Sequence, residues 1–309
     1  MSDQQSVAGK TIVITGASSG FGRGAAEELG RLGANVVVVA RRIGILDDMA
    51  ARIVAAGGSA VAVEADVSDA RAVARVRDTA LQQFGRIDVW VNNVGVGALG
   101  FFWDIPVEDQ ARVVDVNLKS VIYGSHAAIT QFRAQGEGVL VNIGSVDSEV
   151  PLAFQATYAA TKAAVLSLGR SLTEELRLDG TLDTIKVGTI MPYAIDTPWW
   201  VHAANYSGHA PRMALIDDPQ IVVDAIVAAC TNPKEQDAVG PKATVSALSH
   251  SMFPKLTERL TAKVVEKEFG KGGPVPPTTG AIYEPIAEGD TVDGGLRERM
   301  RREDELAKD

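Results

Sequence analysis

Tyr158 and Lys162 are four residues apart in a segment rich in alanine and leucine. The apolar spacing from residue 153 to 176 predicts a helix, and residues four apart lie on the same face of a helix. A cation near a phenol favours its ionised form, and lowering a phenol pKa from about 10 to about 7 requires roughly 4 kcal/mol of differential stabilisation. We therefore expect Tyr158 to act as an acid or base near neutral pH.

Ser145 lies thirteen residues before Tyr158, just after the apolar run 138–143. This run predicts a buried strand, so the serine hydroxyl is expected to meet the helix face across a strand-to-helix connection. A tyrosine and a lysine at this spacing are, on their own, typical of an ordinary helix surface. Their chemical meaning therefore depends on the rest of the chain.

The elements that must position these residues follow a regular alternation. From residue 10 onward, short β-branched runs alternate with longer amphipathic stretches. Continuous apolar strands separated by helices indicate parallel strands buried on both faces, with right-handed crossovers. We expect an α/β doubly wound parallel sheet, whose ligand crevice lies at the carboxyl ends of the strands. The predicted strands are 11–15, 35–40, 60–64, 88–91, 138–143 and 183–190, and the first predicted helices are 21–32, 43–55 and 70–84.

The first strand is followed by the glycine-rich sequence TGASSGFG at residues 15–22. Glycines allow a tight turn and a close backbone approach to a pyrophosphate, which the N-terminus of the next helix also favours. The spacing differs from G-x-G-x-x-G, and glycine also occurs in ordinary turns. Its place after the first strand favours dinucleotide binding, and the residues expected at the cofactor are Gly16, Ser18, Ser19, Gly20, Phe21 and Gly22.

Arg41 follows the second predicted strand directly, at the position where an acid would bind a free ribose hydroxyl and a cation would bind a 2′-phosphate. No acidic residue follows until Asp47. The guanidinium of Arg41 offers a planar donor fork suited to a phosphate. The alternative is that Arg41 and Arg42 are a solvated pair on a loop. We expect NADP(H) as the cofactor rather than NAD(H).

The composition restricts the classes of partner. Of 309 residues, 46% are apolar and 22% charged, as in ordinary globular proteins, and the net charge of −9 opposes nucleic acids and anionic membranes. The single cysteine, Cys230, allows no internal disulfide. The chain start lacks an apolar signal region and no run is long enough to span a bilayer, so a cytoplasmic location is expected.

An ordered set of motifs from residue 9 to about 240 resembles the short-chain dehydrogenase/reductase family, in its single-domain branch with a T-G-x-x-x-G-x-G loop. The resemblance implies a Rossmann fold and a nicotinamide cofactor. Any one motif could occur by chance, but the ordered set is specific. The matching motifs are Thr15 to Gly22, Asp66-Val67, Asn92-Asn93-Val94-Gly95, Asn117, Ser145, and Tyr158 with Lys162.

For the cofactor, the resemblance implies that Asp66 and Val67 contact the adenine ring. It implies that Asn92 and Gly95, with Asn93 between them, shape the floor of the cofactor site. Asp66 is also suited to a helix start ahead of Ala70.

For the chemistry, the resemblance implies that Ser145 orients a substrate carbonyl and that Tyr158 transfers a proton. Lys162 is implied to hold the nicotinamide ribose and to lower the Tyr158 pKa. Asn117 is implied to kink its helix and hold a water that links Lys162 to solvent. The alternative for Asn117 is a core amide whose hydrogen bonds are satisfied by the protein.

The segment 191–198 matches the part of the family that covers the nicotinamide. Thr197 and the backbone of Ile195 are implied to bind the carboxamide, with Pro192 also at the cofactor. Tyr193 replaces the glycine that usually follows the proline, and its side chain is expected to narrow the pocket or alter the loop.

Residues 199–217 are aromatic and lack clear periodicity. We expect a mobile lid over the active site. Its aromatic and histidine side chains either line an apolar pocket or form the packing core of the lid, and no metal site is expected. The side chains concerned are Trp199, Trp200, His202 and Tyr206.

Two regions are expected, a catalytic domain at 1–245 and a C-terminal extension at 246–309. The extension contains an amphipathic stretch at 253–269, a Gly- and Pro-rich linker or arm at 270–280, and a charged end expected to be mobile. Ile282, Tyr283 and Ile286 suggest that the arm docks, with a neighbouring subunit as one candidate. The resemblance implies a homodimer or homotetramer built on the helices around Asn117 and Tyr158.

We therefore expect an NADP(H)-dependent carbonyl reductase or alcohol dehydrogenase acting on a small-molecule carbonyl or alcohol substrate that is apolar and larger than a simple sugar. An NAD(H)-dependent alcohol dehydrogenase is a second possibility. A non-catalytic NADP(H)-binding sensor or scaffold is a third, which the intact catalytic positions disfavour. An isomerase or dehydratase on the same fold is a fourth, because fold alone does not decide function.

Overall fold

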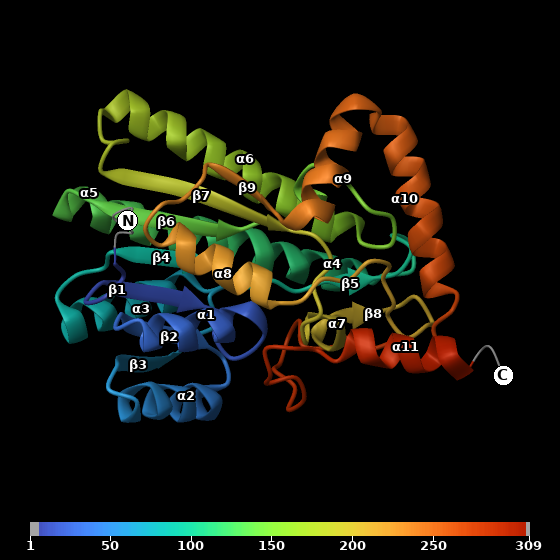
Figure 1. Cartoon of the computed structure of the whole chain (residues 1–309), viewed down its shortest axis with the longest axis horizontal. Helices are drawn as coiled ribbons and strands as arrows, with labels where there is room; N and C mark the ends of the chain where they lie inside the picture. Colours follow the sequence, from blue (N-terminus) through green and yellow to red (C-terminus); the bar gives the residue numbers. More distant parts are fainter. Residues whose placement is uncertain (1–5, 307–309) are drawn as a thin grey trace.

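The computed structural model describes residues 6–306 and is built around a parallel sheet of seven strands, in the order β3-β2-β1-β4-β6-β7-β9 (Figure 1). The central strands are buried on both faces because they consist largely of valine and isoleucine. The strands are β1 Thr11–Thr15, β2 Asn35–Ala40, β3 Ser59–Glu64, β4 Val89–Asn92, β6 Gly138–Ile143, β7 Ile185–Pro192 and β9 Gln236–Val239.

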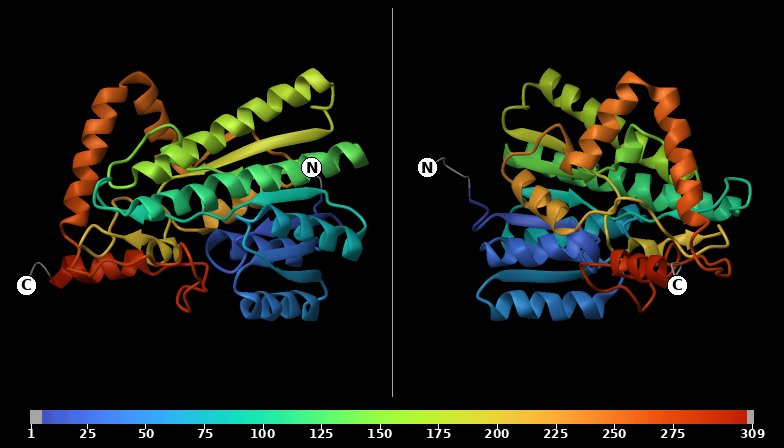
Figure 2. Two further views of the ribbon diagram at one scale, coloured as in Figure 1. Left: turned by 180° about the vertical axis from the view of Figure 1, so that it is seen from behind. Right: turned by 45° about the vertical axis from the view of Figure 1, so that its right-hand side comes forward.

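Two layers of helices cover the sheet (Figures 1 and 2). One face packs against α1 (Gly20–Arg31), α2 (Ile43–Ala55) and α8 (Gln220–Ala229), whose apolar side chains share a core with alternate strand residues. The other face packs against α3 (Ala70–Phe84), α5 (Ser120–Gln135) and α6 (Ala156–Asp179). The expected doubly wound α/β fold is confirmed.

The strand order reverses between β1 and β4, because the chain first extends to β2 and β3 and then returns to the other side of β1. Such a switch point leaves a crevice beyond the carboxyl ends of the strands. The glycine-rich turn after β1 and the segments after β4 and β6 all lie at the carboxyl ends of the strands. The fold therefore brings the predicted motifs together beyond the carboxyl ends of the strands.

Helix α6 begins three residues later than the pattern predicted. Phe154 adopts a φ of 68°, a left-handed conformation that a helix cannot contain, and Gln155 occupies the N-cap position. Helix α6 then runs for 24 residues from Ala156 to Asp179 and carries both Tyr158 and Lys162.

Residues 199–217 contain the short helix α7 (Trp199–His202) and strand β8 (Ala204–Asn205), which pairs with β5 (Ala98–Leu99). The C-terminal region begins with a helical hairpin, α9 (Gly240–Met252) and α10 (Pro254–Phe269), which stands out from the body of the molecule (Figure 1). Of these two helices, the pattern predicted only the second.

The chain then returns to the body of the protein and ends in α11 (Leu296–Leu306) (Figure 2). The charged end is helical over 296–306, where the carboxylate of Asp196 caps this helix, and the mobility of the end stays a prediction. The Oδ1 of Asp196 accepts from the Leu296 N–H at 2.8 Å and its Oδ2 from the Arg297 N–H at 3.0 Å. Residues 307–309 lie outside the described residues.

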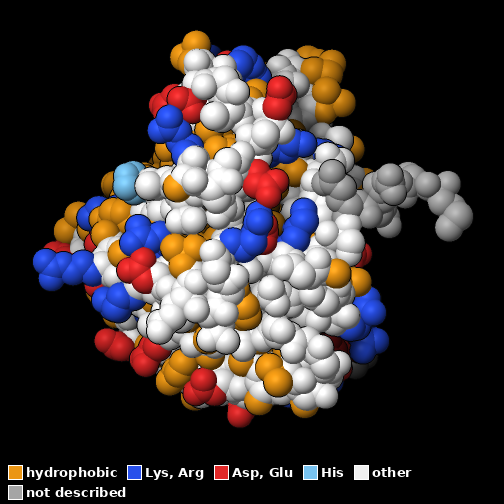
Figure 3. Space-filling view, turned by 90° about the vertical axis from the view of Figure 1, so that its left-hand side faces the viewer, with side chains coloured by type: hydrophobic (Ala, Val, Ile, Leu, Met, Phe, Trp, Pro, Cys, Tyr) orange, Lys and Arg blue, Asp and Glu red, His pale blue; other side chains and the backbone are white. Residues whose placement is uncertain are grey.

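The side of the molecule at the left of Figure 1 carries charged side chains of both signs interspersed with hydrophobic ones (Figure 3). Among residues 6–306, no helix combines the length and the apolar character needed to cross a bilayer.

Candidate active site

Ser145, Tyr158 and Lys162 line one cavity of about 720 Å³. Strand β6 ends at Ile143, and Ser145 follows it as the cap of a short 3₁₀ turn, Val146–Ser148. Tyr158 and Lys162 reach the same cavity from the first turns of α6. The strand-to-helix connection thus brings together the three side chains that the sequence singled out.

Lys162 is almost fully buried, and its Nζ donates a hydrogen bond to the Ile143 carbonyl at 2.8 Å. The nitrogen lies 5.6 Å from the centre of the Tyr158 ring. Burial lowers the Lys162 pKa to about 8, although the negative charge of Asp147 acts in the opposite direction. The ammonium is therefore close to the phenol but is bonded to the strand.

The expectation that Lys162 lowers the Tyr158 pKa is wrong for this structure. Tyr158 is half-buried, and its pKa is raised because the phenolate would lose part of its hydration; the charge of Asp147 raises the pKa further. A hydrogen bond with Ser145 lowers the pKa, but by less. Tyr158 is accordingly a protonated phenol at neutral pH in this structure.

Asn117 lies in a π-helical turn, Asp115–Lys119, between α4 (Val107–Val114) and α5. Its side chain is fully buried. The Oδ1 accepts from the Val96 N–H at 2.8 Å, and the Nδ2 donates to the Val96 carbonyl at 2.9 Å and to the Thr161 hydroxyl at 3.2 Å. A π turn interrupts the regular helix, as the expected kink requires. The proton path through Asn117 remains a prediction.

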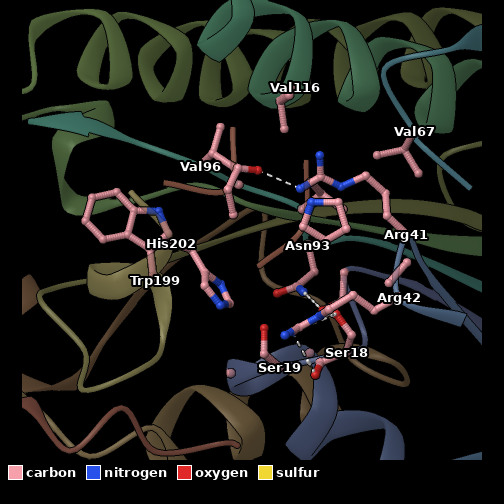
Figure 4. Close-up of a pocket in the computed structure, with 18 of the residues that line it drawn as sticks. Ser18, Ser19, Arg41, Arg42, Val67, Asn93, Val96, Val116, Trp199 and His202 are labelled. Carbon is pink, nitrogen blue, oxygen red and sulfur yellow. Dashed lines mark hydrogen bonds between the residues drawn. The ribbon is translucent and has the colours of Figure 1, made fainter. Parts of the chain in front are cut away.

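A second cavity of about 930 Å³ lies at the carboxyl end of β1 (Figure 4). In Figure 4, Arg41 and Arg42 approach it from one side, and Trp199 and His202 lie on the other. The predicted cofactor residues that line it are Gly16, Ser18, Ser19, Gly20, Phe21, Gly22, Arg41, Asp66, Val67, Asn93, Gly95 and Thr197.

The residues that line this cavity are of the types that suit a dinucleotide. The N-terminus of α1, a favourable place for an anion, opens onto it. The glycines are required by close packing: a Cβ on Gly16 would lie 2.9 Å from the Asn93 amide nitrogen, and one on Gly22 only 2.3 Å from the same atom. Asn93 holds the turn through hydrogen bonds from its Nδ2 to the carbonyls of Thr15 and Gly16.

Asn92 does not line either of these cavities, in contrast to the expectation for the cofactor floor. Its side chain is buried beneath the sheet edge, where it accepts from the Trp90 indole N–H at 2.8 Å and donates to Ser125 and Asn142. Side chains alternate across a strand, so Asn92 and Asn93 point to opposite faces.

Residues 191–198, the segment predicted to cover the nicotinamide, border the Tyr158 cavity, which Pro192, Ile195 and Thr197 all line. Thr197 lines both cavities, so the two adjoin at this residue. Tyr193 also faces the Tyr158 cavity and occupies space that the usual glycine would leave open.

Two of the four lid side chains line the Tyr158 cavity. Trp199 packs edge-on against the Tyr158 ring, with centroids 5.3 Å apart, and Trp200 packs against Trp199. His202 instead lines the cofactor cavity, and Tyr206 hydrogen-bonds to Asp109. The described residues contain no group of three or more side chains suited to a metal ion.

The C-terminal arm lies over the cofactor cavity, which the sequence did not predict. We call residues 281–291 the strap. Arg41 donates to the strap carbonyls of Ala281 and Tyr283, and Arg42 donates to strap carbonyls and to Ser18. The Gly20 N–H donates to the Thr291 carbonyl at 2.8 Å. The arm thus docks on its own chain.

Sequence reasoning also missed Asp147 and Gln155, which line the Tyr158 cavity. Asp147 is 3% exposed, and its Oδ2 accepts from the Gln155 Nε2 at 2.8 Å. The signal was available in the sequence as an acidic residue two positions after Ser145, next to the end of a buried strand.

Comparisons with known proteins agree with this geometry. The model of the family described as short chain dehydrogenase matches residues 10–205. The chain is 36% identical over 259 residues to an uncharacterized oxidoreductase, YxnA, of Bacillus subtilis, covering 83% of this chain and 72% of the relative. It is 38% identical over 212 residues to 3beta-hydroxysteroid dehydrogenase 1 of Eggerthella lenta, covering 67% and 77% of the two chains.

Among solved structures, a 3-ketoacyl-(acyl-carrier-protein) reductase from Brucella melitensis, complexed with NADH, superimposes with a TM-score of 0.67 at 29% identity. The match covers 77% of this chain and the whole of the reductase. The additional length of this chain includes the extension whose strap covers the cofactor cavity. With its fold, its ordered motifs and these relatives in agreement, the chain belongs to the short-chain dehydrogenase/reductase family of oxidoreductases.

Proposed function

We propose that this protein transfers a hydride between NADP(H) and a carbonyl or secondary alcohol, with Tyr158 as the general acid and base. The proposal rests on one observation, which is that the two cavities meet at Thr197. One has the residues that suit a dinucleotide, and the other contains Ser145, Tyr158 and Lys162. A substrate in the second cavity would therefore lie beside the nicotinamide end of the first.

The bound cofactor supplies hydride chemistry, and the protein supplies position and proton transfer. In this proposal the Ser145 hydroxyl donates to the substrate carbonyl and stabilises the charge that develops on its oxygen. Tyr158 donates the proton to that oxygen. Lys162 adds a positive charge near the phenol, and we assign to it the binding of the nicotinamide ribose.

The raised pKa of Tyr158 supports the reductive direction near neutral pH, because a protonated phenol is the form that can donate. In the oxidative direction the phenolate is required, so the rate of alcohol oxidation is expected to rise with pH. The ordinary phenol pKa near 10 places this rise on the alkaline side.

NADP(H) is favoured because Arg41 and Arg42 both face the cofactor cavity at the end of β2, and no acidic residue occupies that position. The second candidate is NAD(H). It is supported by the strap, which accepts hydrogen bonds from Arg41 that a 2′-phosphate would otherwise receive. The Brucella melitensis reductase is itself complexed with NADH.

The test follows nicotinamide absorbance with NADPH and separately NADH over a panel of apolar ketones, aldehydes and quinones. Tyr158→Phe is expected to lower kcat by roughly 10²- to 10⁴-fold while leaving the cofactor Kd unchanged. Arg41→Ala is expected to weaken NADPH binding more than NADH binding. Tight cofactor binding without turnover of any carbonyl or alcohol would contradict the proposed enzymatic activity and favour a sensor. A clear preference for NADH would contradict the proposed binding of a 2′-phosphate by Arg41.

A further inference from the structure

The cavity that contains Tyr158 has a buried carboxylate to which the proposed chemistry assigns no role. Asp147 is 3% exposed and Gln155 is 9% exposed, and both line this cavity with the reacting side chains. The proposed proton transfer uses Ser145, Tyr158 and Lys162 only. A carboxylate in such a place is costly unless donors satisfy its oxygens.

The position of Asp147 is fixed relative to Ser145. Its backbone N–H donates to the Ser145 Oγ at 3.1 Å within the 3₁₀ turn. Its Oδ2 accepts from the Gln155 Nε2 at 2.8 Å, which joins the turn to the N-cap of α6. The same turn therefore holds both the carboxylate and the serine hydroxyl, so their relative positions are fixed.

Two acceptor atoms of this pair have no protein donor. Within residues 6–306, no hydrogen bond is formed to the Oδ1 of Asp147 or to the Oε1 of Gln155. Neither oxygen is among the fully buried side-chain atoms that lack a hydrogen-bond partner, so both keep some accessible surface. The two acceptors lie in the cavity wall, so a molecule in the cavity can supply the missing donor.

The surroundings restrict what that donor can be. Lys162 is a buried cation in the same cavity and disfavours a second positive charge, which argues against an ammonium group. The remaining wall is largely aromatic and aliphatic, which suits an apolar body. The side chains of this wall include Leu152, Tyr193, Trp199, Trp200 and Met213.

We propose that Asp147, oriented by Gln155, determines substrate specificity by accepting a hydrogen bond from a hydroxyl group of the substrate. The substrate class is then an apolar ketone that carries a hydroxyl in addition to the reacting carbonyl, or the corresponding diol in the oxidative direction. This inference rests on the proposed function, and it adds a second point of recognition at the Ser145 turn.

The test compares kcat/KM for cyclohexanone with that for 2-, 3- and 4-hydroxycyclohexanone, with NADPH, at a pH near 8.5, where the Asp147 carboxyl, whose pKa is about 7, is ionised. At least one hydroxyketone is expected to exceed cyclohexanone by roughly 10-fold or more, as for a hydrogen bond to a charged group. Asp147→Asn keeps the shape of the side chain, but Gln155 holds its one oxygen and a neutral amide N–H replaces the charged acceptor, so this ratio is expected to fall by roughly 5-fold or more. A general loss of folding or a change in the Tyr158 pKa affects both ketones alike and cancels in the ratio.

Glu149→Gln is the matched control, because Glu149 lies just beyond the same turn but pairs with Arg170 at 3.1 Å and is absent from the cavity wall. Its ratio is expected to equal that of the unmodified protein. A ratio near one in the unmodified protein, or a ratio that survives in Asp147→Asn, overturns the inference.

A binding measurement separates failure of this inference from failure of the proposed function. Cyclohexanol and the cyclohexanediols are titrated while the tryptophan fluorescence is followed, since Trp199 and Trp200 line the cavity. A diol that binds roughly 10-fold tighter than cyclohexanol, with the preference lost in Asp147→Asn, supports the inference even if no ketone is reduced. Equal binding of diol and alcohol contradicts it even if ketones are reduced.

Discussion

Lys162 and Asp147 are both about 3% exposed and line the same cavity, so each influences the protonation of the other. The Lys162 ammonium has the Ile143 carbonyl as a direct partner, and the Asp147 carboxylate has the Gln155 amide. Neither partner carries a charge. Burial therefore dominates both groups, lowering the Lys162 pKa to about 8 and raising the Asp147 pKa to about 7.

The raised pKa of Asp147 has a consequence for folding stability. Between pH 4 and 7 the folded protein binds a proton at Asp147 that the unfolded chain does not, since the carboxyl pKa rises from 3.8 to about 7 on folding. Stability therefore falls as pH rises through this window. The uncharged Asp147→Asn variant does not lose stability in this way. Its free energy of unfolding, relative to that of the unmodified protein, is therefore expected to rise from pH 4.5 to pH 7.5, by at most about 4 kcal/mol.

Urea unfolding at the two pH values measures this difference. Glu149→Gln again serves as the control, because its carboxylate is outside the cavity and its stability difference should not change with pH by more than about 0.5 kcal/mol. A stability difference for Asp147→Asn that is constant with pH would mean that the buried carboxyl has an ordinary pKa.

At this scale the sequence was informative where a residue type and its spacing define chemistry. The Tyr158 and Lys162 pair on one helix, and Ser145 after a buried strand, are local patterns. Asp147 was missed because an acidic residue near a strand end is common, and its burial depends on side chains far away in the sequence. The Tyr158 pKa was predicted in the wrong direction for the same reason, since desolvation is set by the whole cavity.

Among the elements, the π turn at Asp115–Lys119 shows how a local irregularity serves the site. It places Asn117 where its amide connects the Val96 backbone to Thr161 in α6. Val96 directly follows Gly95, one of the residues predicted to form the floor of the cofactor site. Three segments that border the two cavities are thereby joined by one buried side chain. The amide in an otherwise apolar helical pattern was a signal in the sequence, but its partners depend on the tertiary structure.

The cap of α11 is a second element whose effect can be measured. Asp196 is 1% exposed, and it binds the first two N–H groups of the helix and the Arg297 side chain at 3.0 Å. Asp196→Ala is expected to lower the free energy of opening of residues 296–306 by about 1–2 kcal/mol, the usual value of an N-cap. Hydrogen exchange of this segment, read by mass spectrometry, gives that free energy.

Asp218→Ala is the matched control, because Asp218 binds the same arginine at 2.9 Å but is an exposed partner. Asp218→Ala is expected to change the free energy of opening of α11 by no more than about 0.5 kcal/mol. Equal exchange in the two variants would show that the Asp196 carboxylate does not hold the helix.

The elements of the sheet were predicted within a few residues because each has its own apolar pattern, whereas the C-terminal region was predicted poorly. Helix α9 has few buried residues, and α11 is highly charged, so neither shows a clear apolar face. Their positions depend on contacts with the lid and with Asp196, which no local pattern encodes.

At the scale of the whole molecule, the extension closes back over the cofactor cavity. Ile282 of the strap is fully buried in a cluster with Val96 and Val116, and Arg112 donates to its carbonyl at 2.8 Å. Ala281, Pro285 and Ile286 form part of the cavity wall. Because these contacts join the end of the chain to its first half, the strap must move locally before a dinucleotide can enter or leave by this side.

Gly289 offers a way to loosen the strap without removing a hydrogen-bonding side chain. It has a φ of 73°, and a Cβ at this position would lie 2.7 Å from both the His202 ring and the Pro198 side chain. Gly289→Ala is therefore expected to displace the strap and to speed NADPH dissociation by roughly 10-fold, which corresponds to about 1.4 kcal/mol. Stopped-flow fluorescence of bound NADPH, chased with excess NADP⁺, measures this rate.

Gly273→Ala is the control within the same extension, because a Cβ on Gly273 meets no atom within 4 Å. Its dissociation rate is expected to match that of the unmodified protein. If the strap gates exchange, association must also become faster in Gly289→Ala, so that the Kd changes less than either rate. Faster dissociation with unchanged association would instead mean that the strap only adds contacts to the bound cofactor, and unchanged rates would mean that the dinucleotide uses another entrance.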